Sequence, residues 1–282
     1  ERASGEYIGI VEPDDFVPVN MYEDLYNAAK KNDLDFVKAD FYRFTGNEED
    51  GTRTLEYNRL DSSGENYNQV IDPFERPFIT KFIMNTWSGI YRREYIEKHH
   101  IRHNTTPGAS FQDNGFFWQT FIYAKRCMFI DKPYYMNRRD NPNSSVKNKE
   151  KVYCMNIEYD FIREIFMQKG NEKLWERFRP YYTYKKYYSY VFTLGRISSE
   201  FTEEYLDRMS REFKRAFDLG EVDLSVFTPY TQKAIELLVK DPQGYYQRYI
   251  LKKGSGPVNI LRRLRRFLGK VKRGIGRRIK KR

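Results

Sequence analysis

The chain has 282 residues, of which 40% are hydrophobic and 17% aromatic, enough to bury one sizeable core with a smaller appendage. Residues 251–282 contain 14 Lys or Arg and no Asp or Glu, whereas the rest of the chain has 36 basic and 39 acidic residues. This distribution of charge excludes a nucleic-acid-binding domain that is basic throughout. The sequence has no apolar run long enough to span a membrane, and its two cysteines cannot form a disulfide framework, so we expect a reducing cytosol.

The first predicted elements are a strand, a helix and a second strand. Residues 7–11 (YIGIV) are almost all apolar, which is typical of a buried strand. A helix opens at Pro18 and ends near residue 32, and residues 35–40 form the next strand, an order that favours an α/β unit. Residues 47–68 are polar and predict an exposed insertion. Apolar residues recur at helical spacing in the helix: Met21, Leu25, Ala28 and Ala29.

The next segment continues the mixed pattern. Residues 86–91 predict a strand and residues 94–99 a short helix. A longer helix begins near Asp113, and residues 128–130 and 133–136 predict two short, edge-like strands.

Long helical patterns replace the strands after Lys147. We therefore expect an α/β domain over residues 1–150, a helical region over residues 151–253 and a basic tail over residues 254–282. The tyrosines between residues 181 and 190 are expected to pack between helices.

Three acidic residues, Glu12, Asp14 and Asp15, follow the first predicted strand directly. In open α/β sheets, ligands bind outside the carboxyl ends of the strands. Mg²⁺ is usually held there by one or two carboxylates together with substrate phosphates, so these residues suit a metal-bound diphosphate. The alternative is that Asp14 and Asp15 only shape a turn and cap the following helix.

Asp113 lies in the segment SFQDNGFFWQ, at the predicted start of a helix. A lone Asp at this position is often a helix cap. The aromatic residues around it could also shape a pocket that raises the pKa of the carboxyl group, as a general base requires.

The histidines and the first cysteine suggest no further site. His99 and His103 are four residues apart, but the helical pattern breaks near Ile101 and no third metal ligand is evident, so we expect loop residues, with His103 a minor candidate near an acceptor. Cys127 is predicted to be a small core residue.

Four separated segments together resemble family 2 glycosyltransferases with the GT-A fold, of the kind that builds bacterial surface polysaccharides. The first is ASGEYIGIVEPDDFVPVNMYEDLYNAAKKNDLDFVKADFYRF. The later ones are WSGIYRREYIEKHHI, SFQDNGFFWQ and KPYYMNRRDNPNSSV, in the same order as in the family. The resemblance covers roughly residues 1–150 and implies a partial, Rossmann-like GT-A domain followed by a helical C-terminal region and an amphipathic basic tail.

The resemblance also implies roles for particular residues. Asp113 matches the catalytic base, which deprotonates an acceptor hydroxyl so that it attacks the anomeric carbon of a nucleotide sugar with inversion. Asp14 and Asp15 would bind the metal, Mg²⁺ or Mn²⁺, and the nucleotide diphosphate. The expected nucleotide-sugar-binding residues are Glu12, Asp14, Asp15, Trp87, Arg138 and Ser144.

The sequence departs from the family pattern in two places. Glu12 stands where the family more often has Asp. The family's first half, which supplies the opening strands and an acidic residue that reads the nucleotide base, is absent. We therefore expect the chain to be part of a longer enzyme and to bind donor weakly by itself.

The tail has the pattern of an amphipathic helix with a cationic face, typical of a helix that lies in a membrane interface. Each basic residue near an anionic surface contributes about 1 kcal/mol. RNA binding and a disordered solubilising end are the alternatives. The expected membrane-binding residues are Arg262, Arg263, Leu264, Phe267 and Leu268.

Taken together, these patterns predict an inverting, metal-dependent glycosyltransferase. It would move a sugar from a UDP-linked donor to a cell-surface polysaccharide or lipid-linked acceptor, as a peripheral protein on the cytoplasmic face of a bacterial plasma membrane. Nucleic acid is not an expected partner. One rival is a catalytically inactive, glycosyltransferase-like binding protein at the membrane, and another is a glycoside hydrolase with two catalytic carboxylates.

Overall fold

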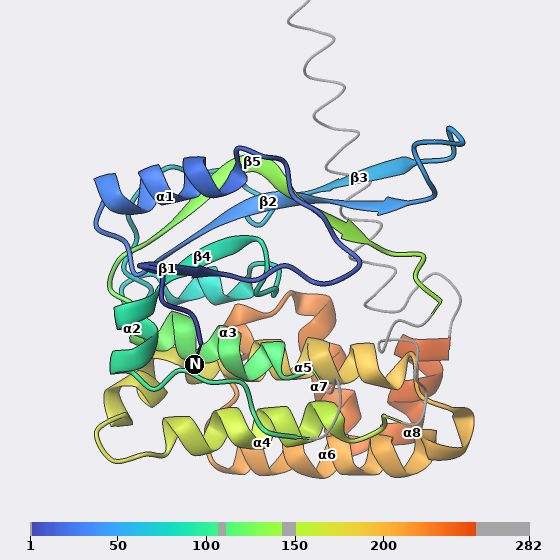
Figure 1. Cartoon of the computed structure of the whole chain (residues 1–282). Coiled ribbons are helices and arrows are strands. Elements are labelled where there is room, and N and C mark those ends of the chain that lie inside the picture. The colour runs from blue at the N-terminus through green and yellow to red at the C-terminus, as the bar shows by residue number, and fades with distance from the viewer. Residues whose placement is uncertain (1, 107–110, 143–150, 252–282) are drawn as a thin grey trace, which may run out of the picture. The chain divides into compact units, whose positions relative to one another are not determined.

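The computed structural model describes residues 2–106, 111–142 and 151–251 (Figure 1). The chain divides into two compact units, of which the first is Glu1–Asn148 with Cys154–Tyr182 and the second is Lys149–Tyr153 with Thr183–Arg282. The first unit contains the sheet and the second is helical. The domain limits expected at residues 150 and 253 stay a prediction.

All the strands that the structure describes lie in the first unit, and helices occur in both units. The strands are β1 (Tyr7–Gly9), β2 (Phe36–Thr45), β3 (Thr54–Asn58), β4 (Gly89–Arg92) and β5 (Cys127–Arg138). The helices of the described chain are α1 (Met21–Lys31), α2 (Arg93–Lys98), α3 (Asp113–Tyr123), α4 (Cys154–Phe166), α5 (Glu172–Leu194), α6 (Thr202–Asp218), α7 (Pro229–Lys240) and α8 (Pro242–Tyr245), with 3₁₀ helices at Pro77–Lys81, Ser199–Phe201 and Leu224–Val226 and a π-helix at Tyr246–Leu251.

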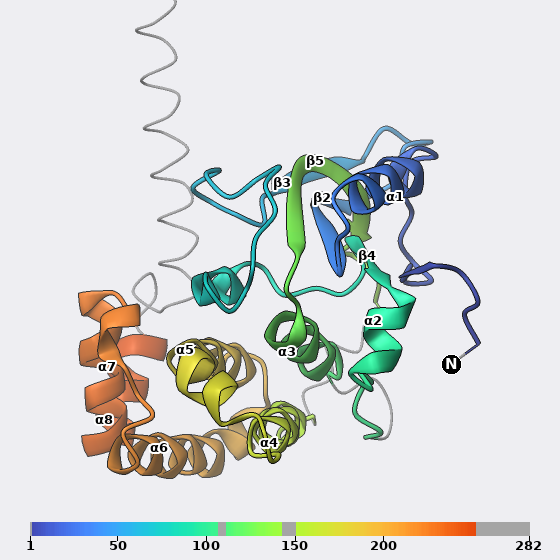
Figure 2. The same cartoon turned by 90° about the vertical axis from the view of Figure 1, so that its left-hand side faces the viewer.

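The sheet is mixed, with the order β1-β4-β2-β3 and β5 paired with β2. β4 pairs with the start of β2 and β3 with its end, both antiparallel, while β5 runs parallel to β2 along its length. The carboxyl ends of β2 and β5, at Thr45 and Arg138, therefore lie at the same edge. α1 covers one face of the sheet and α3 the other, where the Phe121 ring lies 5.0 Å from that of Phe36 (Figures 1 and 2).

Several predicted elements are confirmed. The helix after Pro18 is α1, and its apolar residues Met21, Leu25 and Ala29 are buried. The long helix does begin at Asp113, and the short helix is α2. The predicted buried strand at residues 7–11 was wrong in part, because β1 ends at Gly9 and Val11 is 45% exposed. Among the described residues β1 pairs only with β4, which leaves its other side less covered.

Two predictions between residues 47 and 136 were wrong. Residues 47–68 are not a wholly exposed insertion, because they contain β3 and the buried residues Leu60 and Asp61. Residues 128–130 and 133–136 are not separate edge-like strands but parts of β5, which shifts its register against β2 next to Asp40. The irregularity falls at Pro133, which has no N–H to donate to the ladder.

A buried carboxylate explains why the polar segment after β2 is ordered. Asp40 is 0% exposed, and its oxygens accept hydrogen bonds from the Tyr57 hydroxyl (2.7 Å), the Tyr67 hydroxyl (2.6 Å) and the Leu60 amide (2.7 Å). Buried charges are stable only when they are paired or hydrogen-bonded, and these three donors meet that requirement. The cluster ties residues 57–67 to the sheet.

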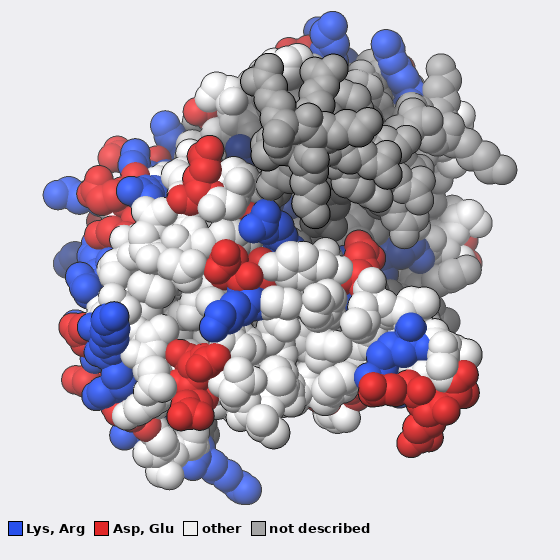
Figure 3. All heavy atoms as spheres, turned by 90° about the horizontal axis from the view of Figure 1, so that it is seen from above, with Lys and Arg blue, Asp and Glu red and all other residues white. Residues whose placement is uncertain are grey.

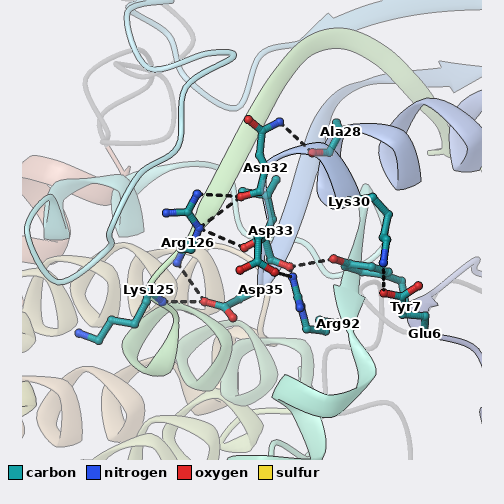
Figure 4. Close-up of polar contacts among 11 residues, drawn as sticks. Glu6, Tyr7, Ala28, Lys30, Asn32, Asp33, Asp35, Arg92, Lys125 and Arg126 are labelled. Carbon is teal, nitrogen blue, oxygen red and sulfur yellow. Dashed lines mark hydrogen bonds and ion pairs between the residues drawn. The ribbon is translucent and has the colours of Figure 1, made fainter.

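The loops at the opposite edge, where β2 and β5 begin, are held by another set of polar contacts (Figure 4). Asp35 accepts hydrogen bonds from the amides of Lys125 (2.8 Å) and Arg126 (2.9 Å). The Arg126 guanidinium donates in turn to the carbonyl of Asn32 at 2.8 Å. These contacts join the end of α1 to the start of β5 and so fix the register of the parallel pair.

The second unit is a helical body with a tyrosine-rich core. Tyr187, Tyr190, Tyr205 and Tyr245 are buried, in agreement with the predicted packing between helices. A partly buried ion pair joins Lys186 of α5 to Glu212 of α6. Burial opposes ionisation of Glu212, but the charge of Lys186 and the hydrogen bonds that Glu212 accepts overcome this and lower the pKa of Glu212 to about 2.

Charge is mixed on the described surface. On the face that Figure 3 presents, Lys and Arg side chains lie interspersed with Asp and Glu, as the near balance of charge before residue 251 predicts. Within the described ranges, no helix combines the length and the apolar character that crossing a membrane requires.

We predict that Asp40→Ala lowers the free energy of unfolding by about 2–4 kcal/mol, because two tyrosine hydroxyls and a buried amide lose their acceptor. Urea denaturation measures this change. Glu49→Ala is the control, since Glu49 is exposed in the same segment and should change stability by less than about 0.5 kcal/mol. Equal stability of the two variants would show that the Asp40 cluster does not hold this segment.

Candidate active site

The acidic segment after β1, residues 12–15 (EPDD), is hydrogen-bonded to the carboxyl end of β5. Asp15 Oδ1 accepts a hydrogen bond from the Arg138 amide at 2.7 Å, and Asp15 Oδ2 accepts one from Asn137 Nδ2 at 3.0 Å. The Glu12 amide donates to the Tyr135 hydroxyl at 2.9 Å. The sequence-predicted residues Glu12 and Asp15 therefore lie at the sheet edge where α/β proteins bind ligands.

Asp14 lies beside this attachment and is hydrogen-bonded to the following loop. Its Oδ2 accepts a hydrogen bond from Asn141 Nδ2 at 2.8 Å. Burial is the main cause that raises the pKa of Asp15, and the nearby Asp14 carboxylate adds to it, while hydrogen bonds from Arg138 and Asn137 oppose it. Neither Asp15 nor Asp14 caps α1, because its N-cap residue is Asn20, whose side chain accepts no capping hydrogen bond, so the helix-cap alternative is wrong.

The described residues contain no group of three or more His, Cys, Asp or Glu side chains arranged to hold a metal ion. The observed donor set still fits one kind of metal. Asp14 and Asp15 supply two adjacent carboxylates, which is the usual protein share for Mg²⁺ when phosphates and water supply the remaining ligands. A metal held by protein side chains alone would not fit this set.

Trp87 joins the acidic segment to the sheet. Its indole stacks on the Tyr135 ring at a centroid distance of 4.3 Å and meets the Phe41 ring edge-on at 4.7 Å. The Tyr135 hydroxyl is the group that accepts the Glu12 amide. The structure thus brings Trp87, Glu12 and the end of β5 together, and the expected contact of Trp87 with a sugar stays a prediction.

A buried lysine that the sequence analysis did not single out supports the Trp87 segment. Lys38 is 1% exposed, and its Nζ donates to the carbonyl oxygen and to Oδ1 of Asn85 at 2.5 and 2.6 Å. Asn85 Oδ1 also accepts the Ser88 hydroxyl at 2.8 Å. A Cβ on Gly89 would lie 2.2 Å from the carbonyl oxygen of Val37, so only glycine fits there. The lone lysine inside the apolar strand DFVKADF was the signal for this support.

Arg138 points away from the acidic segment. Its Nη2 donates to Asn47 Oδ1 at 3.1 Å, and its Nε lies 3.3 Å from Asp140 Oδ1. Its guanidinium lies over the Phe44 ring at 5.3 Å. Ser144 lies outside the described residues, as do Arg262, Arg263, Leu264, Phe267 and Leu268. The roles expected for these side chains stay predictions.

Asp113 is the first residue of α3 and follows a strained turn. Phe111 has a φ of 67°, a left-handed conformation that is uncommon for a bulky residue and often found at functional sites. Asn114 is buried and donates from Nδ2 both to the Phe111 carbonyl at 2.9 Å and to Asp113 Oδ1 at 3.1 Å. The turn and Asn114 together set the orientation of the Asp113 carboxylate.

The structure brings Asp113 within electrostatic range of the acidic segment. Burial raises the pKa of Glu12, and the charges of Asp15, Asp113 and Asp14 raise it further, in that order. Three carboxylates from the end of β1 and one from the start of α3 therefore share one region of negative charge. Such a region suits a cationic metal and a base that gains a proton during the reaction.

Glu158 of α4 is a second charged group near Asp113 that the sequence analysis missed. It is 0% exposed, and burial, with the charge of Asp113 as a smaller cause, raises its pKa to about 7. Its Oε1 accepts a hydrogen bond from Asn104 Nδ2 at 3.0 Å. The sequence does contain a signal for the burial of Glu158. Met155, Glu158 and Ile162 recur at helical spacing, so Glu158 lies on the buried face of α4.

The histidines lie where the sequence predicts. α2 ends at Lys98, before His99, whose ring stacks on Tyr123 at 4.9 Å. The His103 ring stacks on Phe116 at 4.6 Å, and burial lowers the pKa of His103. Cys127 is 0% exposed, as expected of a core residue.

A mixed sheet with carboxylates at the carboxyl ends of its strands defines an α/β protein whose ligand site lies at that edge. Residues 1–100 match the family model described as Glycosyl transferase family 2, so the resemblance to this family is confirmed. The chain is 32% identical over 145 residues to the uncharacterized glycosyltransferase EpsJ of Bacillus subtilis, a match that covers 51% of this chain and 40% of EpsJ. It is 29% identical over 198 residues to a cholesterol galactosyltransferase of Borreliella burgdorferi, covering 66% and 54% of the two chains.

Solved structures agree on the fold. The crystal structure of S. aureus TarS 1-349 in complex with UDP-GlcNAc matches with a TM-score of 0.58 at 12% identity, over 87% of this chain and 67% of that one. The complex of the same protein with UDP matches with a TM-score of 0.50 at 14% identity, over 86% and 64%. The predicted GT-A-like α/β fold followed by helices is therefore confirmed. The chain spans about half the length of the curated relatives it matches.

We predict that Glu158→Gln changes how stability depends on pH. The folded protein binds the Glu158 proton more tightly than the unfolded chain does, so ionisation of Glu158 makes the wild type less stable as pH rises from about 4.5 to about 7. Glutamine has no proton to lose in this window, so the variant gains stability relative to the wild type by up to ~3 kcal/mol at pH 8 compared with pH 4.

Urea denaturation between pH 4 and pH 8 checks this prediction. Glu164→Gln is the matched control, because Glu164 is exposed on the same helix and should leave the pH dependence unchanged. A difference between Glu158→Gln and wild type that is constant with pH would contradict it.

Proposed function

We propose that this protein is an inverting, metal-dependent glycosyltransferase that moves a sugar from a UDP-linked donor to a cell-surface polysaccharide or lipid-linked acceptor. The observation that carries the proposal is the meeting of two groups of carboxylates. Asp14 and Asp15 lie at the carboxyl end of β5, and Asp113 lies close enough to raise the pKa of Glu12 in the same segment. An enzyme of this class needs a diphosphate site and a base close to each other.

The comparisons support the donor class. The TarS crystal structures contain UDP-GlcNAc and UDP, and the curated relatives are named as glycosyltransferases. A bound Mg²⁺ or Mn²⁺ would be held by Asp14 and Asp15 and would offset the negative charge that develops on the leaving diphosphate.

The residues of this chain would act as follows. Asp113 accepts the proton of the acceptor hydroxyl, and the oxygen forms a bond to the anomeric carbon of the donor sugar. The bond between that carbon and the diphosphate oxygen breaks, and its electron pair leaves with the nucleotide diphosphate. The attack comes from the side opposite the leaving group, so the configuration at the anomeric carbon is inverted. Trp87, which stacks on Tyr135, would contact a sugar ring.

We predict that Asp113→Asn in the full-length protein lowers sugar transfer by about 10²–10⁴-fold, because the amide cannot accept the hydroxyl proton. UDP binding, measured by calorimetry with Mn²⁺, should change by less than about threefold, since Asp113 does not hold the diphosphate. Asp207→Asn is the control, because Asp207 is exposed on α6. Equal loss of UDP binding and transfer would assign Asp113 to structure instead of chemistry.

The same assay separates the two rivals. An inactive, glycosyltransferase-like binding protein would bind UDP and show no transfer to lose. A glycoside hydrolase needs neither nucleotide nor metal, so its activity would survive a chelator, whereas the proposed enzyme should lose activity with EDTA and regain it with Mn²⁺.

The location at the cytoplasmic face of a bacterial plasma membrane is part of the same proposal and rests on the sequence of residues 251–282. We predict that deletion of these residues weakens binding to phosphatidylglycerol-containing vesicles by more than about 100-fold, since 14 basic residues are lost. Co-sedimentation measures this, with phosphatidylcholine vesicles as the uncharged comparison. Ser substitutions of Leu264 and Phe267 keep the charge, so full binding by that variant would favour an unstructured cationic end over an amphipathic helix.

A further inference from the structure

Glu158 and Asp113 approach each other across the contact between α4 and α3. Gly115 lies in the first turn of α3, and a Cβ built there would lie 3.1 Å from Glu158 Oε2 and 2.8 Å from the Phe161 ring. α4 is therefore packed directly against the turn that begins with Asp113. A larger residue at position 115 would press on the Phe161 ring and displace the Glu158 carboxylate by a few tenths of an ångström.

A structural role alone does not account for an acidic residue here. Asn104 Nδ2 donates to Glu158 Oε1, and a glutamine carbonyl could accept that bond equally well. A buried carboxylate that faces no cation costs free energy, because ionisation away from water is unfavourable. Hydrogen bonds from Asn104, Thr106 and the Gly115 backbone favour the ionised form of Glu158 only in part, because burial still raises its pKa to about 7. An acid at this position thus destabilises the fold relative to an amide.

Among the groups that the structure describes around Glu158, Asp113 is the one charged neighbour. From α3, Asp113 acts on it as a negative charge. From the segment between α2 and α3, Asn104 and Thr106 face it as neutral polar groups, and the Gly115 backbone does so from α3. Residues 107–110 are Pro-Gly-Ala-Ser and contain no titratable side chain. Ionisation of Glu158 is therefore coupled chiefly to Asp113, and the two carboxylates disfavour each other's charge.

We propose that Glu158 is a positioning residue for the catalytic base: its buried carboxylate supports the first turn of α3, and its negative charge, when present, strengthens the affinity of Asp113 for the acceptor proton. This inference rests on the proposed function and deepens it. Near neutrality Glu158 changes between its protonated and ionised forms, so Asp113 has two strengths as a base. The ionised form of Glu158 gives the stronger base and the faster transfer.

The test is the pH profile of donor turnover by the full-length protein. UDP release is measured from UDP-glucose, UDP-galactose and UDP-GlcNAc with Mn²⁺, with water as the acceptor. We expect kcat of the wild type to rise through about pH 7. Glu158→Gln should lack this rise and have kcat lower by about tenfold at pH 8, with KM for donor within about twofold of wild type.

Glu158→Asp is the conservative variant, because it retains a titrating carboxylate. It should keep a step in the profile, moved in pH, while the control Glu164→Gln should match the wild type. The proposal is overturned if Glu158→Gln keeps the wild-type step, or if it loses kcat equally at every pH together with a raised KM, which is the result of a purely structural role.

Failure of the proposed function gives a different result. If the wild type releases no UDP from any donor, the glycosyltransferase proposal fails and this inference fails with it. The pH dependence of the free energy of unfolding would still report the ionisation of Glu158 in that case. If the enzyme is active and its stability changes with pH near 7, but kcat shows no step there, only the coupling of Glu158 to Asp113 is overturned.

Discussion

The attachment of the acidic segment to β5 is the interaction on which the candidate site depends. Asp15 accepts hydrogen bonds from the backbone of Arg138 and the side chain of Asn137, two residues 122 and 123 positions away in the chain. β5 is in turn aligned with β2 by a parallel ladder, which the contacts of Asp35 and Arg126 hold at its beginning. The place of Asp14 at the sheet edge thus follows from the register of two strands, and Trp87 joins the same point through Tyr135.

Three buried ionisable side chains of the first unit differ in how their hydrogen bonds offset the cost of burial. Asp40 is surrounded by three donors, which offset part of the cost of burying its carboxylate, although burial still raises its pKa. Lys38 is satisfied by Asn85 and orders the segment before β4. Glu158 accepts hydrogen bonds from Asn104, Thr106 and the Gly115 backbone, yet burial still raises its pKa. Asp40 and Lys38 each order the segment that is hydrogen-bonded to them. The proposed role of Glu158 depends instead on its neighbour Asp113.

The sequence predicts the parts of this protein that follow from local pattern. The apolar spacing of Met21, Leu25 and Ala29 predicts α1, and the apolar run before Glu12 predicts a strand that ends in carboxylates. The sequence does not predict β3. The segment 47–68 is held in place by hydrogen bonds to Asp40, and these join residues up to 27 positions apart in the chain. The partner of Glu158 was equally hidden, since it lies on another helix 45 positions earlier.

Helix α4 lies beyond residue 150, where the composition changes, yet it belongs to the same compact unit as the sheet. The glycine contact between α3 and α4 fixes the spacing of two interacting carboxylates. A chimera between relatives that joins one sheet to another protein's helices at the compositional break would separate Asp113 from Glu158. Such a chimera should therefore fold and function better when α4 is kept with the sheet, and the segment to keep together is longer than residues 1–100, which match the family model.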